Sequence, residues 1–110
     1  MIELPPNVRI CNRDYRLRYF HDDEAESEGA DGLIHYRSGL IRIQSLQDNT
    51  SILETVLHEV AHAINQVANV NSDETTEEEL VTRTTPIWMC VWRDNPDLLG
   101  LVNQYAQGEL

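Results

Sequence analysis

The chain has 110 residues, of which 41% are hydrophobic and 25% are charged, and its formal net charge is -11 at pH 7. This composition is typical of a soluble globular protein, and we expect residues 1–110 to form a single domain with its own hydrophobic core. The negative charge argues against nucleic acid and anionic membranes as partners, because both attract positively charged surfaces. No stretch approaches the ~18 apolar residues of a membrane-spanning helix.

Residues 1–6 lack the basic and then apolar regions of a signal peptide. We therefore expect a cytoplasmic protein, in which Cys11 and Cys90 are buried free thiols rather than a disulfide. All eight basic residues are arginine. An acidic composition without lysine is compatible with adaptation to high salt, and equally with GC-rich codon usage in the host, so both interpretations stay open.

The N-terminal half of the chain alternates apolar and polar residues in the manner of β-strands. Two hairpins are expected, one over residues 8–20 and one over residues 33–43. The acidic residues 22–31 between them predict a solvated loop, which can also gate a cleft. The pattern therefore predicts a small antiparallel sheet made of two hairpins.

A long amphipathic helix is expected next. Ser51, three residues before Glu54, is a capping-box pattern that predicts the helix start. Apolar residues then recur at three- and four-residue spacing, which is the periodicity of one helical face: Leu53, Val56, Leu57, Val60, Ile64 and Val67.

Two further helices complete the predicted fold. One begins between residues 72 and 76 and meets Pro86, which we expect to kink or divide it. The last begins with Asn95 as its cap and Pro96 in its first turn. The predicted class is α+β, with the small antiparallel sheet packed on three helices.

The predicted first helix carries the pattern His58-Glu59-Val60-Ala61-His62. Residues four apart on a helix lie ~6 Å apart along the axis and on nearly the same face, so two imidazoles can reach one metal ion. The glutamate between them lies beside the open coordination position, where it can act as general base on a metal-activated water. The apolar stripe lies opposite the histidines, so we expect them on the polar face rather than in the core.

A catalytic zinc ion usually has three protein ligands and a water. No histidine follows His62, so the third ligand is expected to be a carboxylate from the next helix. Glu77 lies closest to the inward face of that helix, Glu78 beside it and Glu79 furthest away, but Pro86 makes this count unreliable. Helical phase therefore leaves five acidic residues open: Asp73, Glu74, Glu77, Glu78 and Glu79.

Four segments, in this order, carry a family resemblance: Gly32-Leu33-Ile34-His35-Tyr36, residues 54–63 with the two histidines, Glu78-Glu79-Leu80-Val81, and Arg93-Asp94-Asn95-Pro96. Together they resemble the small zincin-like metallopeptidases of the gluzincin type that are common in phages and prophages.

The resemblance implies a minimal zincin-like domain with a Zn²⁺ ion held by His58, His62 and Glu78, with Glu79 as the alternative third ligand. It also implies a viral or prophage-encoded protein in the host cytoplasm. The expected function is zinc-dependent hydrolysis of a peptide or protein substrate, with Glu59 as general base.

Two further roles are expected around this site. The strand at residues 40–44 is a candidate for pairing with an extended peptide substrate. The candidate donors to the oxyanion are His35, Tyr36 and Tyr105. Two other hypotheses stay open: a non-catalytic zinc-binding regulatory or interaction protein, and a structural domain whose histidines bind no metal.

Overall fold

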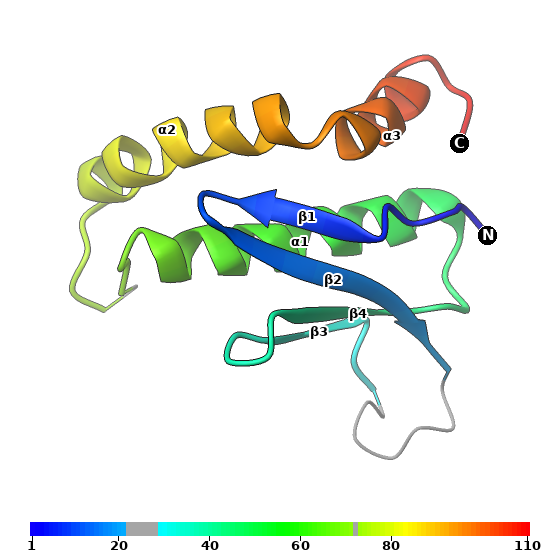
Figure 1. Ribbon diagram of the computed structural model, residues 1–110, viewed down its shortest axis with the longest axis horizontal. Helices are drawn as coiled ribbons and strands as arrows, with labels where there is room; N and C mark the ends of the chain where they lie inside the picture. Colours follow the sequence, from blue (N-terminus) through cyan, green and yellow to red (C-terminus); the bar gives the residue numbers. More distant parts are fainter. Residues whose placement is uncertain (22–28, 72) are drawn as a thin grey trace.

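The computed structural model describes residues 1–21, 29–71 and 73–110 (Figure 1). Most of the predicted acidic loop, residues 22–28, therefore lies outside the described residues. Four strands precede three helices, as predicted for the α+β class. Their bounds are β1 Asn7–Ile10, β2 Arg13–Phe20, β3 Gly32–His35, β4 Leu40–Gln44, α1 Asn49–Val67, α2 Glu77–Asp94 and α3 Pro96–Ala106.

The four strands form one sheet in the order β1-β2-β4-β3. Both predicted hairpins are present, because β1 pairs antiparallel with β2 and β3 pairs antiparallel with β4. The two hairpins join through β2 and β4, however, and these strands are parallel, with Leu17 opposite Ile41. The prediction of a purely antiparallel sheet is therefore wrong: the sheet is mixed, since the second hairpin enters it with its second strand innermost.

This topology changes which strand is open to a partner. β4 has hydrogen-bonded neighbours on both sides, whereas β3 lies at the edge of the sheet. The prediction that residues 40–44 pair with a substrate is therefore wrong, because the backbone of β4 is already used. Ile41 and Ile43 of β4 are fully buried, as expected for a strongly apolar strand in the interior of the sheet.

The hydrophobic core lies between the sheet and α1. α1 packs against β3 and β4 on one face of the sheet, and α2 lies against β1 (Figure 1). Because side chains alternate along a strand, apolar residues lie on this face of the sheet, and Arg16, Arg18 and Arg42 lie on the opposite face. The fully buried members of the core include Val8, Ile10, Ile41, Ile43, Ile52, Val56, Val60, Ala63, Ile64, Val91 and Leu98.

The helix starts follow local capping rules. The N-cap of α1 is Asp48, whose carboxylate accepts a hydrogen bond of 2.7 Å from the Ser51 amide. This bond lowers the pKa of Asp48. The predicted start at Ser51 is thus slightly late. α2 begins in the predicted region, with Thr76 as its N-cap, and continues through Pro86 to Asp94 without dividing.

Asn95 has a larger role than the predicted cap of α3. It occupies the N-cap position, but its side chain makes no capping bond. The buried side-chain amide instead accepts a bond from the Arg9 amide and donates to the carbonyls of Arg9 and Val91, each at 2.7 Å. Asn95 therefore ties β1 to the junction of α2 and α3.

Two other expectations concern cysteines and membranes. Cys11 and Cys90 are both free thiols, as predicted, but Cys11 is exposed and Cys90 is only partly buried, so the prediction that both are buried is wrong. Among the described residues, no helix combines the length and apolar character needed to cross a lipid bilayer.

Candidate metal centre

The middle of α1 carries both histidines and the glutamate between them. His58 and His62 are exposed, whereas Val56, Val60 and Ala63 on the opposite side are fully buried. The predicted placement of the two imidazoles on the polar face is therefore confirmed. This placement follows from the helical period, because the apolar stripe anchors the other side of α1 to the sheet.

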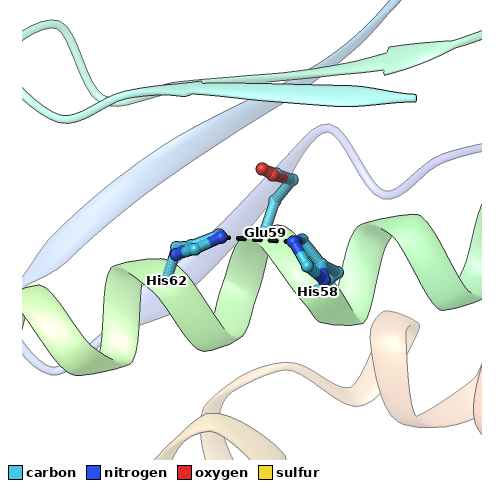
Figure 2. A group of neighbouring side chains, drawn as sticks. All are labelled: His58, Glu59 and His62. Atoms are coloured by element: carbon cyan, nitrogen blue, oxygen red, sulfur yellow. Dashed lines mark hydrogen bonds between the residues drawn. The ribbon is translucent and has the colours of Figure 1, made fainter. Parts of the chain in front are cut away.

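The two imidazole rings converge on a common point (Figure 2). Their Nε2 atoms lie 3.2 Å apart, and the ring planes cross at 75°. Two nitrogens bound tetrahedrally to zinc at about 2.0–2.1 Å lie roughly 3.3–3.4 Å from each other. The observed spacing thus fits a zinc ion, and it equally fits an N–H···N hydrogen bond between the rings of the metal-free protein.

Within the part of the chain that the structure describes, one group of at least three metal-binding side chains is assembled: His58, Glu59 and His62, with ligand atoms within 4.8 Å of one another. The acidic residues at the start of α2 are not in this group. The Glu79 carboxylate accepts a bond from the Thr76 amide, and the Glu79 amide donates to the Thr76 hydroxyl. Glu79 thus helps to begin α2, while Glu78 is exposed, and both stay predictions as third ligands.

Glu59 is buried, although its neighbours His58 and His62 are exposed. Its side chain is 5% exposed, and its Oε2 atom is buried without any hydrogen-bond partner. Leaving a buried carboxylate oxygen unpaired costs about 1–3 kcal/mol or more, so such atoms are rare and often point to a missing partner. A water or an ion beside the histidine pair would supply that partner.

The burial of Glu59 depends on the edge strand above it. A Cβ atom at Gly32 of β3 would lie 2.6 Å from Thr55 Cγ2 and 3.1 Å from Glu59 Cγ. Only glycine therefore lets the strand approach α1 this closely. Figure 2 shows the Glu59 side chain rising from α1 toward the second hairpin. The sequence motif locates Glu59 but does not predict that β3 covers it, since the contact joins Gly32 and Glu59, which are 27 positions apart.

Tyr36, directly after β3, lies near the Glu59 carboxylate. Burial raises the pKa of its phenol, and the nearby Glu59 carboxylate raises it further. The backbone is held by Arg13, whose guanidinium donates to the carbonyl of Tyr36 and, at 2.9 Å, to that of Arg37. A tyrosine phenol is protonated at neutral pH and can donate a hydrogen bond, and the raised pKa of Tyr36 extends this state to higher pH.

Two hollows flank the histidine pair. The first, of about 370 Å³, is bordered by His58 and by Gly32 at the start of β3. The second, of about 420 Å³, is bordered by His62 and by Tyr36 just beyond the end of β3. The edge strand therefore spans from one hollow to the other, alongside the two histidines.

The other predicted residues lie elsewhere. His35 is exposed on β3, and Tyr105 is 54% exposed on α3, a helix that borders neither hollow. Of the three candidate oxyanion donors, only Tyr36 borders a hollow together with a histidine of the pair.

No protein-family model matches the chain, and comparison with curated proteins and with solved structures finds no significant match. The geometry of the site is therefore the basis for a functional assignment.

Proposed function

We propose that the protein is a zinc-dependent metallopeptidase that hydrolyses peptide or protein substrates. The observation that carries this proposal is the buried, unpartnered Oε2 of Glu59, one residue from an imidazole pair whose Nε2 atoms lie 3.2 Å apart. A carboxylate kept dry and unpaired beside two converging imidazoles is costly for a purely structural site. It is the arrangement that a general base next to a metal-activated water requires.

In this mechanism His58 and His62 would hold the ion, together with a carboxylate from the first turn of α2, for which the family resemblance implies Glu78. A bound zinc ion supplies Lewis acidity, which acidifies a water and polarises the scissile carbonyl. Glu59 accepts the proton of the attacking water and passes it to the leaving amine.

The edge strand β3 is the proposed guide for the substrate. The Gln44 amide donates to the Asp31 carbonyl at 2.9 Å, so the backbone of residue 31 faces β4. Because strand backbone groups alternate in direction, Gly32 and Ile34 present their N–H and C=O groups at the open edge. An extended peptide that adds to this edge passes both hollows. Its scissile carbonyl then lies near Tyr36, which we propose as the donor to the developing oxyanion.

The test uses two variants and a chelator. A dye-labelled, denatured casein is incubated with the wild-type chain, with Glu59→Gln and with His58→Ala. Zinc is measured in all three proteins. We expect chelator-sensitive cleavage by wild type, zinc without cleavage for Glu59→Gln, and loss of zinc for His58→Ala. Undiminished cleavage by the Glu59 variant would remove Glu59 from the mechanism.

A second candidate function is zinc binding without catalysis, as in a regulatory or interaction protein. It is favoured by one observation: the described group of ligand atoms has no third protein ligand beyond the glutamate of the motif. Stoichiometric zinc together with no cleavage of casein would support this alternative. Both candidates fit a protein of viral or prophage origin that acts in the host cytoplasm.

A further inference from the structure

The three consecutive glutamates at the start of α2 point in different directions around the helix. At about 100° per residue, Thr84 lies about 20° from Glu77, and Val91 about 40° from it. Thr84 and Val91 are the two buried residues of α2. Glu77 therefore begins the inward face of the helix, whereas Glu78 and Glu79 are turned away from Glu77 by about 100° and 160°. The count from Glu77 to Thr84 does not cross Pro86, and α2 continues through Pro86 to Val91 without interruption.

The hollow beside His62 also distinguishes Glu77 from Glu78 and Glu79. Glu77 borders this hollow, together with His62 on α1, Thr76 and Leu80, whereas Glu78 and Glu79 do not. Glu79 is in addition held in the capping box with Thr76. Helical phase and the shared hollow thus agree in distinguishing Glu77 from its neighbours.

We propose that Glu77 is the third protein ligand of the metal, in place of the Glu78 that the sequence resemblance implies. This inference rests on the proposed zinc site. The carboxylate of Glu77 is not in the described group of ligand atoms. To bind the metal, the Glu77 side chain therefore has to rotate about its side-chain torsion angles. The Glu77 side chain is exposed, and such a rotation leaves the core undisturbed.

The chemistry of the ion supports a carboxylate at this position. Two neutral imidazoles leave both positive charges of the ion uncompensated, and an anionic oxygen ligand stabilises the complex. Binding of Glu77 would also link the start of α2 to the middle of α1. Added zinc should therefore protect the backbone amides of the first turn of α2 from hydrogen exchange.

The experiment compares the zinc affinity of four proteins by competition with a chromophoric chelator: wild type, Glu77→Gln, Glu78→Gln and Glu79→Gln. Each substitution removes the same charge, and glutamine at position 79 preserves the capping-box pattern. We expect Glu77→Gln to weaken zinc binding by at least about 100-fold, since even indirect partners of a metal ligand typically contribute 10- to 100-fold. The other two variants should stay within roughly threefold of wild type, as expected for exposed charges.

Two further readouts exclude a purely structural effect. The metal-free Glu77→Gln protein should unfold at the same temperature as metal-free wild type. The visible absorption bands of the cobalt-substituted variant should differ from those of cobalt-substituted wild type, because the loss of a carboxylate ligand changes the coordination of the ion.

Each outcome is decisive. A large loss of affinity in Glu78→Gln with none in Glu77→Gln would overturn the inference and leave the zinc site intact. Equal, small losses in all three variants would also overturn it, since they would reflect net charge alone. If wild type binds no zinc, it is the proposed function that fails.

Discussion

Gly32 of β3 lies directly over Glu59 of α1, so closely that a Cβ atom at position 32 would come within 3.1 Å of Glu59 Cγ. The edge strand β3 therefore covers Glu59, the general base of the proposed mechanism. The relationship joins the first residue of β3 to the glutamate of the His-Glu-x-x-His pattern.

Substitution of Gly32 by alanine should destabilise the protein by about 1–3 kcal/mol, because the added methyl group overpacks the contact with α1. The nearest obstacle is Thr55 Cγ2, at 2.6 Å. A Thr55→Ser change removes that methyl group and keeps the hydroxyl that bonds to Gln47 and Ser51. Urea unfolding should therefore show that the double variant recovers part of the loss. A single Gly32→Ala variant as stable as wild type would contradict the close approach.

The Glu59→Gln substitution should stabilise the metal-free protein while it abolishes turnover. The buried Oε2 has no partner, and removing its charge relieves a desolvation cost of about 1–3 kcal/mol. Thermal unfolding in the presence of a chelator measures the effect. A matched change at an exposed glutamate of the same helix, Glu54→Gln, should leave the melting temperature nearly unchanged. A lower melting temperature for Glu59→Gln would mean that the carboxylate has a stabilising partner.

The Tyr36→Phe substitution tests the proposed oxyanion donor. Loss of one such donor typically lowers kcat by about 10²–10³-fold. Zinc affinity and KM should stay close to wild type, because the phenol is not a metal ligand and acts on the transition state. Steady-state kinetics on labelled casein separate these quantities, with the exposed Tyr105→Phe as control. An unchanged kcat would remove Tyr36 from the mechanism.

The Asn95→Ala substitution should cost about 2–4 kcal/mol, since three hydrogen bonds of roughly 1 kcal/mol each are lost and buried backbone groups are left unpaired. The bonds join Asn95 to Arg9 and Val91. Denaturant unfolding measures the loss, and the exposed Asn103→Ala on α3, the helix that follows Asn95, should change stability by less than about 0.5 kcal/mol. A mild effect at Asn95 would show that packing alone holds β1 to α2.

Local features of this fold could be predicted from the sequence. The histidine helix, its polar face and the two hairpins each depend on residues that are close in the chain, so periodicity and turn residues suffice. The start of α1 was placed slightly late because Asp48 and Ser51 are both good N-caps, and the Asp48 carboxylate reaches the Ser51 amide.

Contacts between distant segments could not be predicted in the same way. Alternation in β2 and β4 predicts two strands but not their parallel pairing, which depends on how the second hairpin enters the sheet. The close contact of Gly32 with α1 and the hollow bordered by both His62 and Glu77 also depend on contacts between distant segments. Each follows from the packing of whole elements, which no local pattern encodes.

Zinc content is the most direct test of the central claim that His58 and His62 bind a metal together. The chain is purified without a histidine tag, dialysed against zinc and then against metal-free buffer, and measured by elemental analysis. We expect one retained zinc ion per chain, lost in His58→Ala, together with a higher melting temperature in the zinc-loaded protein. Retention of no zinc, with no change in melting temperature, would contradict it.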